Sequence, residues 1–143
     1  MSLLSPNDRQ TLTAHLAPIT TQVDLLLFTQ TFGGSESGLV AKQVLDEVAS
    51  LNDKVTVVEK NFVLDTEDRE KYGVDKSPAV VVLSGGVDTR MRLYGANTGY
   101  EFVTVVEAVL LAGTGNVELE PESVAALAAV QKPMRIQVFT TPT

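Results

Sequence analysis

The side chains that most often carry protein chemistry are scarce in this sequence. The 143 residues contain no cysteine and a single histidine, His15. The absence of cysteine excludes a disulfide framework, a cysteine-ligated zinc site and a thiol nucleophile within these residues. A lone histidine also argues against a transition-metal site. We expect His15 to be solvated on a short helix without a role of its own, and we predict no cofactor.

The segment Gly33-Gly34-Ser35-Glu36-Ser37 is the first place where a site could lie. It precedes a helical apolar repeat, so its backbone N–H groups would favour an anion. A serine hydroxyl needs a neighbouring base to act as a nucleophile, and the sequence offers none nearby. The favoured interpretation is a helix cap formed by Ser35. A remnant peptide or thiol contact is the alternative, and catalysis has the least support. Phe32 beside it either fills space or contacts a partner.

Two groups of acidic residues resemble cation sites only superficially. The first group comprises Asp65, Glu67, Asp68 and Glu70, and the second comprises Glu118, Glu120 and Glu122. The first group lacks the alternating spacing and central glycine of a calcium loop. We interpret the first as the solvated opening turn of a helix capped by Asp65, and the second as a solvated linker and the start of the helix that follows it.

The composition is typical of one globular domain and reduces the range of binding partners that we expect. Apolar residues make up 44% and charged residues 20% of the chain, which is ordinary for a folded protein. The net charge of −7 disfavours nucleic acids and anionic membranes as partners. The N-terminal residues lack the basic region and apolar core of a secretory signal, so we expect a cytoplasmic protein.

The apolar pattern predicts an α/β fold whose elements follow the order α-β-α-β-α-β-β-α. The expected helices are 6–17, 35–51, 65–73 and 98–112, and the expected strands are 23–28, 54–59, 80–83 and 90–94. Ser5 predicts a helix cap, Gly85-Gly86 a hairpin turn, and Thr98 with Glu101 a capping box. The right-handed crossover rule leaves few arrangements for the first β-α-β unit.

The last part of the chain repeats the beginning. A helix is expected over 121–130 and a strand over 134–140, and the strand ends in Phe-Thr as the strand at 23–29 does. One strand cannot fold alone, so it must join a neighbouring sheet, pair with another molecule or remain free. We therefore expect a fragment of a longer protein, with a dimer through this strand as an alternative.

These residues resemble proteins with two tandem thioredoxin folds. The matching features are the N-terminal helix, Ser77-Pro78-Ala79 before an apolar strand, and Tyr94 to Phe102, where Gly95 precedes Gly99-Tyr100-Glu101-Phe102. One similar group is the glutaredoxin-like protein disulfide oxidoreductases. The other is the N-terminal domain of the flavoprotein subunit of alkyl hydroperoxide reductase.

The resemblance implies a thioredoxin-like fold with a central mixed four-stranded sheet over residues 1–115. Residues 116–143 would be a linker helix and the first strand of a second unit, interrupted just before its Cys-x-x-Cys. The Ser77–Pro78 bond would be cis. We prefer the interpretation that this bond only shapes the entry to the strand; the alternative is that Ser77, Pro78 and Gly95 form a groove that binds a peptide.

The chain departs from this pattern where the redox cysteines would lie. Gly34, Ser35, Glu36 and Ser37 occupy the positions of the pair, so the resemblance implies a redox-inactive, non-catalytic unit. Its partner would be the second thioredoxin-fold unit of the same chain, with the redox activity residing there. The alternative is a free-standing module that binds a peptide or a partner protein.

Overall fold

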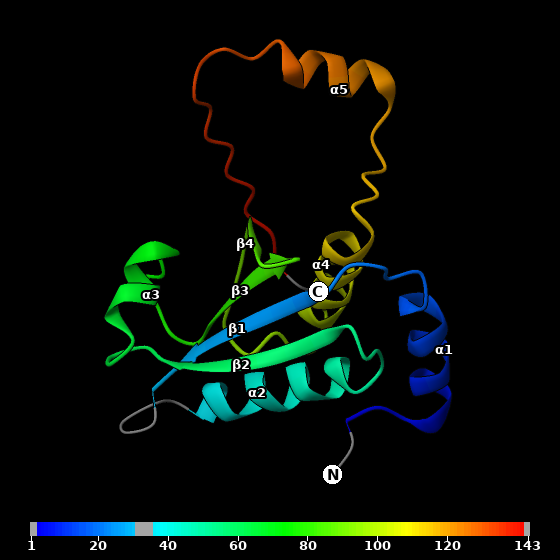
Figure 1. Ribbon diagram of the computed structural model, residues 1–143, viewed down its shortest axis with the longest axis vertical. Helices are drawn as coiled ribbons and strands as arrows, with labels where there is room; N and C mark the ends of the chain where they lie inside the picture. The colour runs from blue at the N-terminus through cyan, green and yellow to red at the C-terminus, as the bar shows by residue number, and fades with distance from the viewer. Residues whose placement is uncertain (1–2, 31–35, 142–143) are drawn as a thin grey trace.

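A computed structural model describes residues 3–30 and 36–141, and its elements follow the expected order (Figure 1). The helices and strands are α1 (Pro6–Leu16), β1 (Val23–Thr29), α2 (Glu36–Ala49), β2 (Val55–Asn61), α3 (Thr66–Lys71), β3 (Ala79–Ser84), β4 (Val87–Tyr94), α4 (Glu101–Thr114) and α5 (Pro121–Ala128). No helix among these residues is long and apolar enough to cross a membrane.

The four strands form one mixed sheet in the order β2-β1-β3-β4. β1 runs parallel to β2, with Val23 opposite Val55, and antiparallel to β3, with Leu26 opposite Val81. β1 is therefore a central strand, which explains its nearly continuous apolar sequence. The predicted four-stranded mixed sheet is confirmed.

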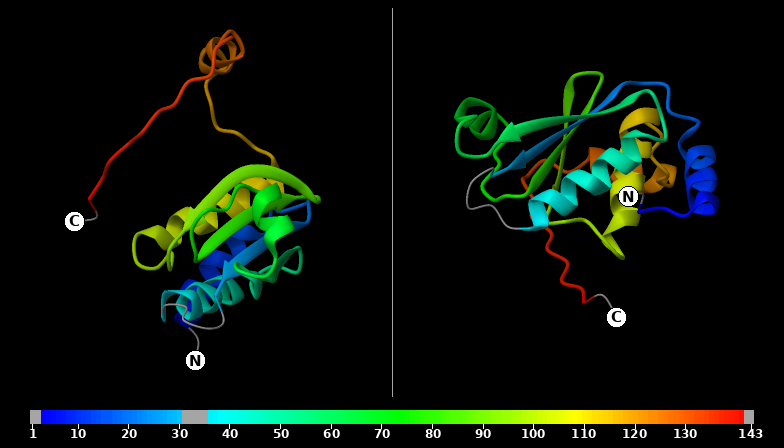
Figure 2. Two further views of the ribbon diagram at one scale, coloured as in Figure 1. Left: turned by 90° about the vertical axis from the view of Figure 1, so that its left-hand side faces the viewer. Right: turned by 90° about the horizontal axis from the view of Figure 1, so that it is seen from below.

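The main hydrophobic core lies between one face of the sheet and the helices α1, α2 and α4. Its members include Leu25 and Leu27 of β1, Leu45 of α2 and Val109 of α4, all fully buried. The buried positions of α2 recur at three- and four-residue intervals, which places one apolar stripe against the sheet. Figure 2 shows α2 and α4 covering the sheet while α1 closes one end of it.

The second face of the sheet has a thinner cover. Leu26, Phe28 and Val81 pack there with Phe62 and Tyr72 from the chain around the short helix α3. The side chain of Arg92 extends this cover. Its Nε donates a hydrogen bond to the Tyr72 carbonyl oxygen at 2.9 Å, and its guanidinium forms a two-pronged contact with Asp88 at 2.8 and 2.7 Å.

Of the expected helix caps at Ser5, Asp65 and Thr98, only the first is confirmed. Ser5 caps α1 as its position indicates, accepting a hydrogen bond from the Asp8 N–H at 3.2 Å. Asp65 occupies the N-cap position of α3, but its side chain makes no cap hydrogen bond, because its carboxylate accepts from the Asn61 N–H at 2.6 Å. The capping box at Thr98 is absent because α4 begins two residues later than the motif requires, with Tyr100 at its N-cap.

Residues 116–141 form an arm that stands away from the rest of the molecule (Figures 1 and 2). Every one of these residues is exposed, including the whole of α5. The strand expected at 134–140 is wrong for this structure, since the chain from 131 to 141 enters neither a helix nor a sheet. A strand requires a neighbour for its backbone N–H and C=O groups, and no described strand lies beside this segment.

Candidate functional site

The candidate site lies at the carboxyl end of β1, where several segments meet. Parallel β1 and β2 end on the same side of the sheet, and α2 begins there. β3 starts and β4 finishes at this end, because Ala79 lies opposite both Phe28 and Tyr94. In open α/β sheets this end commonly carries the ligand site.

Ser77 and Pro78 are fixed to the neighbouring strand ends. The peptide bond between them is cis. The Ser77 hydroxyl donates to the carbonyl oxygen of Phe28 at 3.3 Å, and the Gly95 N–H donates to the Pro78 carbonyl oxygen at 3.0 Å. Pro78 is buried and Ser77 is half-buried. The structure therefore brings three of the expected site residues together.

The segment from Gly34 to Ser37, expected to correspond to a redox pair, is described only in part. Gly34 and Ser35, together with Phe32, lie outside the described residues. Glu36 opens α2 and is exposed, and Ser37 follows in the same turn. A Cβ atom on Gly38 would lie 3.5 Å from the Thr29 Cγ2 atom, so this turn of α2 rests against the end of β1. Ser37 and Ser77 thus come from segments that meet at one strand end.

Asn97 is a residue of this region that sequence reasoning missed. It is the buried polar residue of the described chain, 4% exposed, and its backbone is left-handed with φ 55°. Its side-chain amide donates to the Gly95 carbonyl oxygen at 3.1 Å. Asparagine tolerates left-handed backbone and bonds locally, so the Gly-x-Asn spacing was the available signal. The contact shapes the turn that leads from β4 to α4.

Tyr94 brings a phenol to the same end of the sheet. Burial raises its pKa, and the charge and hydrogen bond of Asp75 raise it further, while Arg92 acts in the opposite direction. The Lys76 ammonium lies 5.9 Å from the ring centroid. A phenol with a raised pKa stays protonated at neutral pH, so Tyr94 can donate a hydrogen bond but supplies no base.

The remaining chemistry is sparse. The described residues contain no group of three or more acidic or histidine side chains that could hold a metal ion. His15 is not simply solvated, since its Nε2 lies 3.1 Å from a carboxylate oxygen of Glu107 and so links α1 to α4. His15 belongs to α1, which lies at the far end of the sheet from α3 (Figure 1). No histidine therefore reaches the candidate site.

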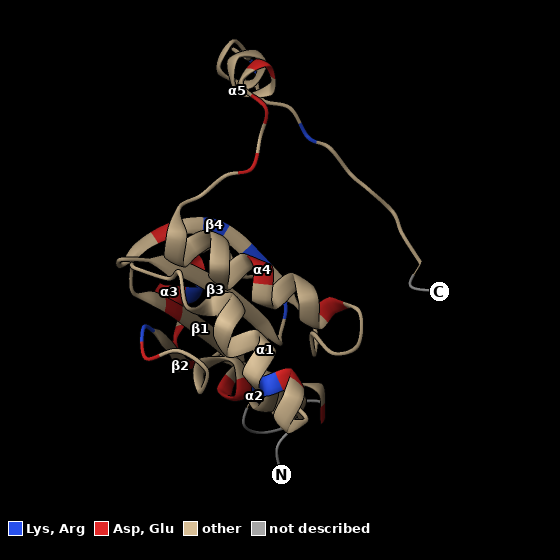
Figure 3. Ribbon diagram, turned by 90° about the vertical axis from the view of Figure 1, so that its right-hand side faces the viewer, with Lys and Arg blue, Asp and Glu red and all other residues tan. Residues whose placement is uncertain are grey.

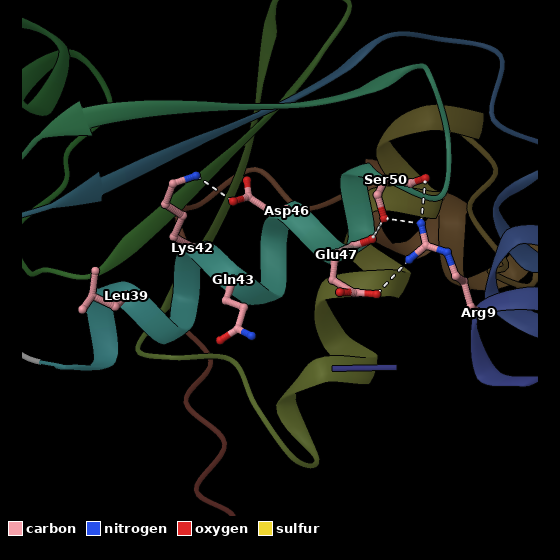
Figure 4. A pocket seen from close by; sticks show the side chains of 7 residues that line it. All are labelled: Arg9, Leu39, Lys42, Gln43, Asp46, Glu47 and Ser50. Carbon is pink, nitrogen blue, oxygen red and sulfur yellow. Dashed lines mark hydrogen bonds and ion pairs between the residues drawn. The ribbon is translucent and has the colours of Figure 1, made fainter. Parts of the chain in front are cut away.

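A shallow depression of about 610 Å³ runs along the outer surface of α2 (Figure 4). Its charged side chains pair with one another: Lys42 contacts Asp46 at 2.6 Å, and Arg9 contacts Glu47 at 2.8 Å. The Asp46 contact raises the pKa of Lys42, which keeps the ammonium protonated. Figure 3 shows the same intermixing of acidic and basic residues over the helices. We assign no chemistry to this depression.

Comparison with known proteins supports the fold and the resemblance. No family model matches the chain. It is 29% identical to the alkyl hydroperoxide reductase protein AhpF of Escherichia coli over 111 residues, which is 78% of this chain and 19% of that protein. The crystal structure of the NTD_N/C domain of AhpF from Enterococcus faecalis aligns with a TM-score of 0.81 at 29% identity, over 90% of this chain and 62% of that one.

A protein disulfide oxidoreductase from Aeropyrum pernix shares the fold. It aligns with a TM-score of 0.74 at 20% identity, over 87% of this chain and 54% of that one. The chain spans less than two thirds of each of these relatives. The thioredoxin-like fold is confirmed, and so is the resemblance to the N-terminal domain of AhpF and to a protein disulfide oxidoreductase.

Proposed function

We propose that this chain is a redox-inactive thioredoxin-like unit that supports a Cys-x-x-Cys unit in the same polypeptide. The proposal rests on one observation: the residues that surround the expected active site are in place, and the cysteine that would react there is absent. Ser77, Pro78 and Gly95 are held against the end of β1, yet the sequence supplies no cysteine to that end. Thiol–disulfide exchange requires a thiolate, and a serine hydroxyl cannot replace it.

The relatives give the proposal its context. Each aligned relative continues well beyond the part that this chain matches, so additional structure accompanies the same unit there. We infer that the parent polypeptide is a thiol–disulfide oxidoreductase or part of a peroxide reductase. In this arrangement Gly34, Ser35, Glu36 and Ser37 are a vestigial active-site loop.

Insulin reduction in the presence of dithiothreitol tests the proposal. The chain should precipitate insulin no faster than the dithiothreitol blank, whereas the longest natural polypeptide that contains it should be active. Replacing both cysteines of a downstream pair by serine should abolish that activity. Activity of the 143-residue chain itself, or a parent without such a pair, would overturn the assignment.

Peptide binding at the same end of the sheet is the second candidate function. Large apolar side chains are exposed on the elements that meet there: Leu39 on α2, Tyr94 at the end of β4, and Tyr100 just before α4. An extended peptide could contact such a surface while its backbone pairs with a strand end. Here Ser77, Pro78 and Gly95 would act as a groove and not only as a structural turn.

An NMR titration separates the two functions. The probe is reduced and alkylated insulin B chain, added to ¹⁵N-labelled protein at millimolar concentration. Saturable shifts confined to Ser77, Gly95 and the first turn of α2 would favour a binding module. Unchanged spectra would argue against peptide binding and favour the proposed role, in which the chain supports a Cys-x-x-Cys unit.

A further inference from the structure

Basic residues are concentrated on one part of an otherwise acidic molecule. The segment 60–94 holds six of the eleven lysines and arginines and an equal number of carboxylates, so the net charge of −7 belongs to the rest of the chain. Two of these carboxylates are already occupied, since Asp75 is hydrogen-bonded to Tyr94 and Asp88 to Arg92. The cations around them therefore form a local excess of positive charge.

Four of these cations lie together along β4 and the chain that leads from α3 to β3. β4 contributes Arg90 and Arg92, and the other segment contributes Lys71 and Lys76; we call these four residues the basic stripe. The two segments are in contact, because the Arg92 Nε donates to the Tyr72 carbonyl oxygen. β4 is an edge strand of the sheet, and Figure 3 shows basic residues along it.

Two tyrosine rings hold the lysines of the basic stripe in place. The Lys71 ammonium lies 4.9 Å from the centroid of the Tyr72 ring, and the Lys76 ammonium lies 5.9 Å from that of Tyr94. The Arg92 guanidinium also lies 5.8 Å from the Tyr72 ring. A ring attracts a cation without neutralising it. Among the described residues neither lysine pairs with a carboxylate, so both ammonium groups can meet an external anion.

A β-bulge orders the other end of the basic stripe. The register between β3 and β4 shifts between Val81 and Leu83, and Arg90 in this region has a left-handed backbone with φ 66°. Its N–H donates to the Asp88 carboxylate at 2.8 Å, the same group that binds the Arg92 guanidinium. Bulges at sheet edges redirect side chains. The bulge therefore fixes the backbone from which the exposed Arg90 projects.

Charged residues on an edge strand also prevent sheets from joining edge to edge. That role requires charge alone, and freely solvated side chains would fulfil it. In the basic stripe the cations are ordered by aromatic rings and by a shared carboxylate, which reduces the entropy that is lost when a partner binds. Ordered cations in contact with aromatic rings therefore indicate a binding surface in addition to a protected edge.

We propose that the basic stripe binds an acidic, extended segment of a partner protein. The cations are spread along β4 and beside it, so a chain with several carboxylates meets them together, whereas a small anion would meet only one or two. Nucleic acid is disfavoured as the polyanion because the molecule as a whole is acidic. The surface meets the candidate site at Tyr94 and extends away from it, so it adds an interaction to the proposed function.

Peptide titration of the ¹⁵N-labelled chain tests the proposal. The probe is a heptapeptide of alternating glutamate and threonine with blocked ends, and the matched peptide has glutamine in place of glutamate. Only the acidic peptide should give saturable shifts of the amides of 71–76 and 88–94. Its affinity should fall as salt is raised from about 50 to about 300 mM, because salt screens exposed charges. Equal binding of both peptides, or no binding of the acidic one, would overturn the proposal.

Two charge-matched double variants locate the surface. Lys71→Gln/Lys76→Gln should weaken binding of the acidic peptide about fivefold, since each lost contact is an exposed ion pair. Lys54→Gln/Lys132→Gln removes the same charge from exposed lysines elsewhere and should change the affinity by less than about twofold. Equal weakening by the two variants would show a general charge effect and overturn the assignment to the basic stripe.

Two further measurements test other occupants of the surface. Tighter binding of a single-stranded RNA oligonucleotide than of the acidic peptide would replace the proposed partner by nucleic acid. Shifts of the same amides when the chain alone is concentrated would assign the surface to the acidic linker of a second copy, at Glu118, Glu120 and Glu122. Either result would overturn the choice of a separate acidic partner.

Discussion

At the scale of single residues, the polar side chains of the candidate site are paired with backbone groups, and the sequence contains no cysteine. The hydroxyl of Ser77 is committed to the Phe28 carbonyl, and the amide of Asn97 is committed to the Gly95 carbonyl. Such contacts satisfy polar groups at strand ends whether or not a substrate binds. They explain how this end of the sheet can persist without cysteines.

If the proposed function is right, introducing two thiols at Gly34 and Ser37 should give the chain part of the activity of a thiol–disulfide oxidoreductase. In the double variant Gly34→Cys/Ser37→Cys, the first cysteine precedes α2, and a helix N-terminus lowers a thiol pKa below its usual value of about 8.5. We expect insulin reduction above background and a thiolate absorbance at 240 nm that persists below pH 8. The single variant Ser37→Cys is the control. Equal activity of the two would show that these positions do not correspond to a redox pair.

Asp88 should make stability depend on acid pH. Its hydrogen bonds to Arg92 lower the pKa of Asp88 from 3.8 to about 2. A lowered folded-state pKa stabilises the fold above the unfolded value, and that contribution disappears as the pH falls from about 4 to 2. Because Asp88 is partly exposed, we expect a loss of about 1 kcal/mol.

Urea unfolding between pH 2 and 5 measures this effect. Asp88→Asn should be less stable than the wild type at pH 5, and the difference should shrink towards pH 2. Asp53→Asn, on an exposed turn, is the matched control. A constant difference between Asp88→Asn and the wild type across this range would contradict the assignment.

At the scale of elements, α4 is attached to the start of β1 through a glycine. The carbonyl oxygen of Gly113 accepts hydrogen bonds from the N–H groups of Thr20 and Thr21 at 3.1 and 3.0 Å. A Cβ atom on Gly113 would lie 2.6 Å from the Cγ2 atom of Ile19. The close approach of α4 to the segment before β1 therefore depends on glycine, which has no side chain, at position 113.

A double-mutant cycle tests this contact. Gly113→Ala should cost about 1–3 kcal/mol of unfolding free energy, because the new methyl group overpacks the site. In the background of Ile19→Ala the same change should cost clearly less, since the obstructing atoms are gone. Additive costs in urea unfolding would show that Ile19 is not the obstruction.

Strands that pair with other strands of this chain were predicted correctly from the sequence. The prediction of a strand was wrong for residues 134–140, which pair with no described strand. β1 has an apolar run that only a central strand buries, so its place was predictable. Residues 134–140 carry apolar residues at alternate positions, as a strand can, yet a strand is defined by its neighbours. The cap at Asp65 failed because a backbone N–H of the preceding strand competes for the same carboxylate. The Asp88–Arg92 ion pair was not predicted, because the sequence of a strand does not indicate which of its side chains contact one another.

At the scale of the whole molecule, a compact body carries an arm with which it shares no packing. The body ends where Gly115 closes α4 with φ 66°. From residue 116 to 141 every residue is exposed. Stability of the body should therefore be independent of the arm.

Limited proteolysis with a glutamate-specific enzyme tests this independence. Glu118 and Glu120 lie in the exposed linker, and exposed linkers are preferred sites of cleavage. We expect early cleavage there and a remaining body whose melting temperature matches that of the whole chain within about 2 °C. Resistance of the linker, or a clearly lower melting temperature after cleavage, would show that the arm packs on the body.

The separation of arm and body also has a consequence for folding during synthesis. β1 pairs with β3, which is made much later, and α4 must follow before the main core closes. A ribosome that has just completed α4 still has the 116–141 segment to translate. Because that segment contributes no core contact, the body can finish folding while the arm is being made. The packing of the body is thus complete in its own residues, and its folding need not wait for synthesis of the arm.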